Sequence, residues 1–102
     1  MKIFITGVAG FLGSHLADLM LSQGHTVAGN DNMIGGYADN VPQNVEFHQV
    51  DCCDLENLTK AMEGCDIVYH TAATAYEGLS VFSPVLVTRN IFEASVTTIT
   101  AA

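Results

Sequence analysis

The chain opens with an apolar run that predicts a β-strand buried on both faces of a sheet. Residues 3–5 read Ile-Phe-Ile and lead directly into Thr6-Gly7, and short continuous runs of this kind are typical of strands covered on both sides. We expect the first strand over residues 2–6. A second, weaker strand is expected over residues 26–30, and alternation of side chains predicts a third over residues 45–50. A fourth is expected over residues 67–71.

Helical spacing of apolar residues predicts helices between these strands. The expected helices cover residues 11–23, 54–63 and 84–96. Gly24 stands where a left-handed residue ends a helix, Asp54 is a good N-cap, and Pro84 suits a first helical position. The expected apolar faces consist of Leu12, Leu16, Leu19 and Met20 in the first helix and of Leu55, Leu58 and Met62 in the second.

The alternation of these elements predicts the fold class. Strands that follow one another through helical crossovers form a parallel sheet with helices on both faces. The length of 102 residues allows one hydrophobic core. We therefore expect an α/β fold, a Rossmann-like doubly wound parallel sheet of about four strands, with residues 1–102 as one domain.

Composition and charge exclude several classes of partner. Hydrophobic residues make up 49% of the chain and charged residues 14%, which is too apolar and too weakly charged for intrinsic disorder. The formal net charge of -8 leaves no basic patch for nucleic-acid phosphates or anionic lipids. No apolar stretch reaches the length of a membrane span. We expect neither nucleic acid nor a membrane as a partner.

The cysteines and histidines point to a cytoplasmic protein without a metal site. Cys52, Cys53 and Cys65 are odd in number and two are adjacent, unlike the cysteines of a disulfide-stapled secreted domain. The amino end reaches Gly7 before it could build the apolar run of a signal peptide. No Cys or His spacing matches a metal site, so we predict no metal. We interpret the adjacent cysteines as small packed side chains, with redox chemistry as the alternative.

Glycine spacing after the first strand predicts a phosphate-binding turn. In the stretch Thr6-Gly7-Val8-Ala9-Gly10-Phe11-Leu12-Gly13 the glycines recur every three residues. In such a turn the first glycine permits a tight bend, the second lets backbone N–H groups approach a diphosphate, and the third allows close packing of helix and strand. The diphosphate would lie at the positive end of the helix dipole. The alternative is a turn that uses glycine for conformation alone.

An acidic residue at the end of the second strand favours the phosphate-binding interpretation. Asp31 follows Gly13 by 18 residues, close to the spacing at which dinucleotide-binding folds place a carboxylate for the adenosine ribose. A 2′-phosphate would meet this charge without any Lys or Arg between residues 3 and 59 to offset it. We therefore expect NAD rather than NADP as the cofactor. An ordinary turn carboxylate is the alternative.

These features, with Asp51-Cys52 and the stretch Asp66-Ile67-Val68-Tyr69-His70-Thr71-Ala72-Ala73, resemble the extended short-chain dehydrogenase/reductases. Within them the chain is most similar to the NAD-dependent nucleotide-sugar epimerases and dehydratases, and the resemblance covers nearly the whole chain. It implies that the diphosphate is cradled by Gly7, Gly10, Phe11, Leu12 and Gly13. It also implies roles for Asp31 and Asn32 at the adenosine ribose, for Asp51 and Cys52 at the adenine, and for Ala72 and Ala73 near the nicotinamide.

Two departures from the family pattern limit the expected activity. Family members usually have leucine where Thr71 stands, and of their Asn-Val-x-Gly-Thr-x-Asn stretch this chain keeps Val85, Thr88 and Asn90. Members also catalyse with a Tyr-x-x-x-Lys pair, and no tyrosine and lysine here have that spacing. We expect no catalytic residue in this chain, which is incomplete relative to the family.

The sequence thus leaves two functional hypotheses open. The first is an NAD-binding segment of an epimerase or dehydratase, which would meet a nucleotide-sugar substrate only if the missing half is supplied. The second is a non-catalytic dinucleotide-binding or assembly module, in which another copy or chain pairs with the open edge of the fourth strand. We interpret His70 as a backbone-bonded strand-end residue, with a proton carrier as the alternative. The stretch 76–80 either contacts substrate or is an ordinary loop.

Overall fold

A single parallel sheet organises the molecule. The computed structural model describes residues 1–33, 37–72 and 92–102. The sheet has the strand order β3-β2-β1-β4, and its strands are β1 (Lys2–Thr6), β2 (Thr26–Asn30), β3 (Glu46–His48) and β4 (Ile67–His70). The helices are α1 (Phe11–Ser22), α2 (Leu55–Ala61) and α5 (Ala94–Ala101), with a short 3-10 helix, η1 (Ala38–Asn40). The doubly wound α/β fold predicted from the sequence is confirmed.

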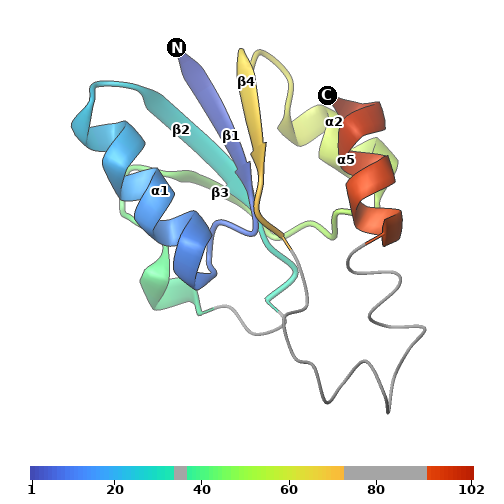
Figure 1. Ribbon diagram of the computed structural model, residues 1–102, viewed down its shortest axis with the longest axis horizontal. Coiled ribbons are helices and arrows are strands. Elements are labelled where there is room, and N and C mark those ends of the chain that lie inside the picture. The colour runs from blue at the N-terminus through green and yellow to red at the C-terminus, as the bar shows by residue number, and fades with distance from the viewer. Residues whose placement is uncertain (34–36, 73–91) are drawn as a thin grey trace.

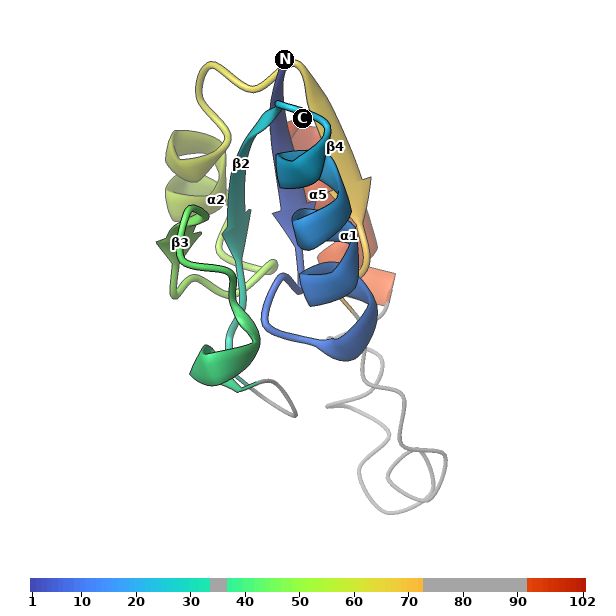
Figure 2. The ribbon, with the colours of Figure 1, turned by 90° about the vertical axis from the view of Figure 1, so that its left-hand side faces the viewer.

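Helices cover both faces of the sheet (Figures 1 and 2). α1 lies on one face, while α2 and α5 lie side by side on the other. Alternation along β1 explains how one strand serves both layers. Ile3 and Ile5 pack in the cluster on the α1 side, and Phe4 packs in the cluster on the α2 side.

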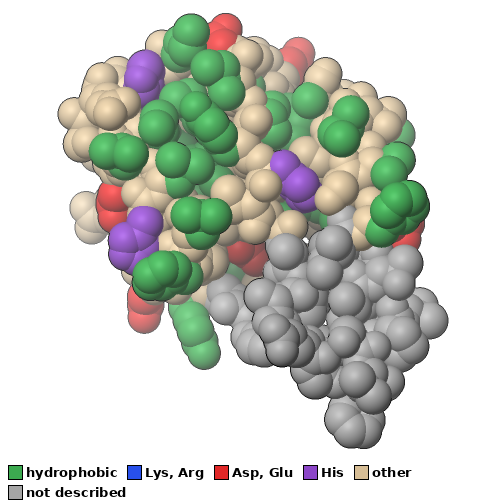
Figure 3. Space-filling model, in the orientation of Figure 1, with side chains coloured by type: hydrophobic (Ala, Val, Ile, Leu, Met, Phe, Trp, Pro, Cys, Tyr) green, Lys and Arg blue, Asp and Glu red, His purple; other side chains and the backbone are tan. Residues whose placement is uncertain are grey.

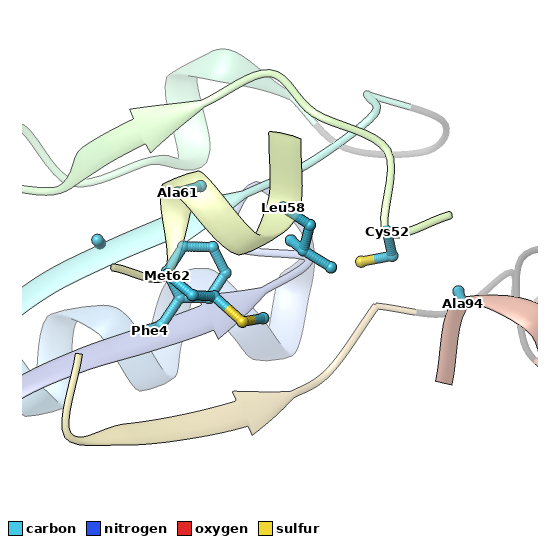
Figure 4. Packing of buried hydrophobic residues seen from close by; sticks show 7 residues of the cluster. Phe4, Cys52, Leu58, Ala61, Met62 and Ala94 are labelled. Atoms are coloured by element: carbon cyan, nitrogen blue, oxygen red, sulfur yellow. The ribbon is translucent and has the colours of Figure 1, made fainter. Parts of the chain in front are cut away.

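The core on the α2 side is built from large side chains. Phe4, Leu58 and Met62 lie together in it with Ala61, and Cys52 and Ala94 close its far end (Figure 4). Asp54 begins α2 as predicted, since its carboxylate accepts a hydrogen bond from the backbone N–H of Asn57. The prediction for Leu55 is wrong, because this side chain at the first position of α2 is 44% exposed.

The predicted apolar face of α1 is only partly right. Leu16 and Met20 pack against the sheet, but Leu12 is 63% and Leu19 50% exposed. The buried residues of α1 are instead the small ones, Gly13, Ser14 and Ala17. Hydrophobic side chains consequently gather on the surface over α1 (Figure 3). The fully buried side of α1 is thus formed by small residues, with Leu16 and Met20 partly buried.

β1 and β2 match their predicted ranges, and the ends of the other elements differ by one to a few residues. β3 is shorter than the predicted 45–50, because the chain turns after His48 and the N–H of Val50 bonds the His48 carbonyl. α1, α2 and β4 fall within the predicted spans, and Gly24 and Gly64 follow the helices with positive φ.

The last helix extends beyond its predicted end. The predicted span was 84–96, of which residues 84–91 lie outside the described residues, but α5 runs to Ala101. Ala94 and Thr98 are buried and Ala101 packs against the core cluster that contains α2 residues. These contacts recur at successive turns and stabilise the helix, although its run of β-branched residues would by itself favour a strand.

Opposite charges on the surface of the described residues form exposed pairs. Lys2 lies 3.7 Å from Glu46, and Lys60 lies 3.5 Å from Glu56 one turn earlier in α2. A hydrogen bond from His48, followed by the charge of Lys2, lowers the pKa of Glu46. None of the helices described is long and apolar enough to cross a bilayer, and no group of three potential metal ligands occurs within the described ranges.

Candidate functional site

The glycine turn lies where β1, β2 and β4 all end (Figure 1). Gly7 leaves β1 with a φ of +69°, a conformation that side chains disfavour. A Cβ atom at Gly7 would also lie 2.8 Å from the Cα atom of Ala72. The first glycine is therefore required twice, by its own backbone angle and by the chain that follows β4.

The other two glycines have different surroundings. A Cβ atom at Gly13 would collide with the carbonyl group of Gly7 and reach within 3.0 Å of the Thr71 hydroxyl oxygen. Among the described residues, a Cβ atom at Gly10 would meet only the Gly7 carbonyl oxygen, at 3.3 Å. Gly13 thus lets α1 approach the turn closely, whereas the described residues crowd Gly10 less.

The first turn of α1 offers backbone donors. Gly10 is the N-cap residue and supplies no side-chain cap, and the first turn contains no acidic residue. The N–H groups of Phe11, Leu12 and Gly13 cannot bond within the helix, because the first turn of any helix has no preceding carbonyls. Such groups, together with the helix dipole, favour an anion. The Phe11 side chain is 82% exposed, so only its backbone belongs to the turn.

Asp31 binds the glycine turn directly. Its Oδ2 atom accepts a hydrogen bond from the Ala9 N–H at 3.1 Å, and its Oδ1 atom accepts one from the Met33 N–H at 2.8 Å. The residue is only 7% exposed. An ionised carboxylate has about four acceptor positions, of which the bonds from the described residues occupy two. Residues 22 positions apart in sequence therefore form one polar site.

The end of β4 is fixed to the same turn by Thr6. The Thr6 hydroxyl oxygen accepts hydrogen bonds from the N–H groups of Thr71 at 3.0 Å and Ala72 at 3.2 Å. Thr71 returns a hydrogen bond from its hydroxyl to the Thr6 carbonyl. Ala72 is thereby held against Gly7. Ala73 and the stretch 76–80 lie outside the described residues.

His70 is bonded differently from the sequence-based interpretation. Its Nδ1 atom lies 2.7 Å from the Thr6 hydroxyl and its Nε2 atom 3.0 Å from the Ser95 hydroxyl, so its partners are side chains rather than backbone. The Thr6 hydroxyl oxygen already accepts two N–H groups, so the hydroxyl hydrogen donates to the unprotonated Nδ1 of His70. The ring proton then lies on Nε2 and is donated to the Ser95 hydroxyl oxygen. This defines the neutral ring, and burial also lowers the pKa of His70.

Asp51 and Cys52 follow β3 beside the end of β2. The Asn30 side-chain amide donates to the Val50 carbonyl at 2.8 Å and holds this segment in place. Asp51 accepts a hydrogen bond from the Cys53 N–H. The Cys52 side chain points into the core (Figure 4), and burial raises the pKa of its thiol. Only the backbone of Cys52 is available to a ligand, and the packed interpretation of this residue fits its position.

Three residues of the site were not predicted from the sequence. Thr6 and Asn30 are polar residues at the carboxyl ends of strands whose central residues are apolar or glycine, and that position was a signal that could have found them. Asn40 bonds the Ala9 carbonyl from η1 at 3.1 Å. Nothing in the local sequence distinguishes it from a loop asparagine.

Asn32, which the sequence did predict as a site residue, lies next to Asp31 and is partly buried.

Comparison with known proteins identifies the family. The model of the "NAD dependent epimerase/dehydratase family" matches residues 3–102. This chain belongs to that family. An Arabidopsis thaliana GDP-mannose 3,5-epimerase is 38% identical over 73 residues, which are 72% of this chain and 19% of that protein.

Solved structures agree with this family assignment. The UDP-glucose 4-epimerase of Thermotoga maritima, solved with UDP-glucose, superposes with a TM-score of 0.95 at 29% identity. The UDP-glucose 4-epimerase of Thermus thermophilus, solved as a complex with NAD, gives 0.92 at 36% identity. Each comparison covers 99% of this chain and 33% of the other. This family member therefore spans about a third of the length of the epimerases that it resembles.

Proposed function

We propose that this chain binds NAD as the cofactor-binding segment of a nucleotide-sugar epimerase or dehydratase. The observation that carries the proposal is the hydrogen bond between the Asp31 carboxylate and the Ala9 N–H. It joins the predicted ribose-binding residue to the predicted diphosphate-binding turn. The family match and the NAD complex of the Thermus epimerase support the same cofactor.

Each part of the site has a distinct task in this proposal. The N–H groups of Phe11, Leu12 and Gly13 bind the diphosphate. Gly10, whose own N–H donates to the Gly7 carbonyl at 3.0 Å, contributes by having no side chain beside them. The acceptor positions of Asp31 that the described residues leave open, with Asn32, bind the ribose hydroxyls. Asp51 and the Cys52 backbone flank the adenine, while Ala72 and Ala73 lie near the nicotinamide. Bound NAD would supply reversible hydride acceptance.

Charge favours NAD over NADP. Asp31 is nearly buried and negatively charged beside the proposed ribose site. Lys2 and Lys60 are the lysines of the described residues, and each lies beside a glutamate instead. A 2′-phosphate would therefore meet an uncompensated carboxylate.

Catalysis requires groups beyond the ones assigned here. Removing a proton from a sugar hydroxyl needs a base with a suitably lowered pKa, and the family uses a tyrosine with a lysine four positions later. No such pair occurs in the 102 residues. We assign cofactor binding to this segment and place sugar chemistry on residues that the segment does not contain.

Calorimetric titration of the chain with NAD and NADP tests this proposal. We expect measurable heat with NAD and weaker binding of NADP. Asp31→Ala should weaken NAD binding by about 1.5–3 kcal/mol, because hydrogen bonds to a charged group are lost. Asp18→Ala, which removes an exposed carboxylate of α1, is the matched control and should bind as the original chain does. Absence of heat with NAD, or tighter binding of NADP, refutes the proposal.

The edge of the sheet favours a second proposal, association through β4. Among the described strands β4 pairs with β1 alone and forms one edge of the sheet. Tyr69 on this strand is 38% exposed. An open edge of this kind can pair with another chain. Sedimentation velocity should then show self-association that rises with concentration, and a monomer at all concentrations would contradict it.

A further inference from the structure

Both backbone polar groups of Ala9 are hydrogen-bonded to residues that lie far from it in the sequence. Its N–H donates to Asp31 Oδ2 at 3.1 Å. Its carbonyl accepts the Asn40 side-chain amide at 3.1 Å and the Tyr37 N–H at 3.2 Å. Ala9 itself has no exposed surface. Both polar groups of this one residue are therefore fully bonded to the crossover that follows β2.

This bonding acts on the most adaptable part of the site. Ala9 lies between Gly7 and Gly10, and glycines lose more conformational freedom on ordering than other residues. The Ala9 carbonyl and the Gly10 N–H belong to one planar peptide group. Fixing the carbonyl therefore also fixes this N–H, which donates to the Gly7 carbonyl at 3.0 Å and closes the turn before Phe11. A turn that is ordered before the ligand arrives loses less entropy on binding.

We propose that Asn40 is a positioning residue for cofactor binding, which orients the diphosphate-binding turn by donating to the Ala9 carbonyl. This inference rests on the proposed function for its effect on NAD. Its effect on the turn is independent of any ligand. Asn40 needs no contact with NAD, because it acts through Ala9. The side chain is specific because it presents a donor, which a carboxylate of the same shape lacks.

Asn40→Asp and Asn40→Ala test the proposal, with Asn44→Asp as the matched control. Asn44 is an exposed asparagine of the same crossover and adds the same charge when replaced. The first readout is amide hydrogen exchange of residues 9–13 without ligand. The second is the NAD dissociation constant by calorimetry. Exchange across the strands and in η1 reports whether the variants keep the fold and the 3-10 turn.

We expect both Asn40 variants to exchange faster at residues 9–13 and to raise the NAD dissociation constant roughly threefold to tenfold. Asn44→Asp should change neither quantity. Unchanged exchange at residues 9–13 in the Asn40 variants overturns the inference, even if NAD binds. Faster exchange confined to η1 also overturns it, since Asn40 would then support only its own turn. Failure of the original chain to bind NAD refutes the proposed function, while the exchange result still decides the role of Asn40.

Discussion

The two helical layers of this small sheet differ in which residues of the helix are fully buried. On the α2 side, Leu58 is fully buried and packs with Met62 and Phe4. On the α1 side, the buried residues of the helix are Gly13, Ser14 and Ala17, while Leu16 and Met20 are partly buried against the sheet. The start of α1 therefore packs through small residues, whereas α2 packs through a large side chain.

The difference follows from what each helix has to position. α1 must bring its first-turn N–H groups to the turn that leaves β1, and a large residue at position 13 would collide with the Gly7 carbonyl. α2 bears none of the residues assigned to the site. Substitutions on the α2 side should therefore change stability alone, whereas those at the start of α1 should change NAD binding as well.

The largest effect is expected on the α2 side. Leu58 is fully buried, so Leu58→Ala should lower the free energy of unfolding by about 2–5 kcal/mol through lost burial and a cavity. Leu55→Ala, three residues earlier in the same helix and largely exposed, should cost far less. Urea denaturation followed by circular dichroism measures both. Equal losses in the two variants would contradict the packing described.

Gly13→Ala should affect both stability and binding. The added methyl group meets backbone that cannot move aside, so we expect a loss of about 1–3 kcal/mol of stability together with weak NAD binding. Gly10→Ala is the contrasting variant, because among the described residues its methyl group meets only the Gly7 carbonyl oxygen, at 3.3 Å. It should fold almost normally and still bind NAD poorly. Normal NAD affinity in Gly10→Ala would show that the diphosphate does not bind next to that residue.

Acidification should destabilise the link between β4 and α5. Burial lowers the folded-state pKa of His70 below its ordinary value of 6.5, so the unfolded chain takes up the proton first as pH falls. The contribution of His70 to stability is complete above about pH 6.5 and is lost as pH falls below that value.

Urea midpoints at about pH 7.5 and about pH 5.5, on either side of that ordinary value, test this effect. His70→Gln should show a smaller decrease between the two conditions than the original chain. An equal decrease in both proteins would assign the pH dependence to other groups.

The smallest effect is expected at the exposed leucines of α1. Leu19→Ser should change the free energy of unfolding by less than about 0.5 kcal/mol, because half of the side chain is already in water. Ala17→Leu, at a fully buried position of the same helix, should be clearly destabilising. Thermal melts of the two variants compare them. A large loss in Leu19→Ser would show that the apolar stripe packs as the sequence alone suggested.

Sequence patterns predicted the order of elements and the parallel sheet, because strand burial and glycine punctuation are local signals. They missed the exposure of Leu12 and Leu19, since apolar periodicity carries no information on how closely a helix approaches its sheet. The extension of α5 was missed because Thr98 and its β-branched neighbours favour strand until packing on the core overrides them.

Some residues of the candidate site could be predicted from the sequence and others could not. Gly7, Gly13 and Asp31 carry signals in their spacing, and the structure brings them together. Asn40 and the hydroxyl of Thr6 act across long sequence separations. Contacts of that kind depend on the register of the folded sheet and on the course of the crossover, which no local pattern records.

Amide chemical-shift mapping by NMR, with NAD and with inorganic pyrophosphate, shows whether the glycine turn binds the diphosphate. We expect pyrophosphate to shift the N–H signals of residues 10–13 and to leave those around Asp31 nearly unchanged. NAD should shift both groups, and Asp31→Ala should retain the pyrophosphate response. If NAD binds without shifting residues 10–13, the glycine turn is not its diphosphate site and the account is contradicted.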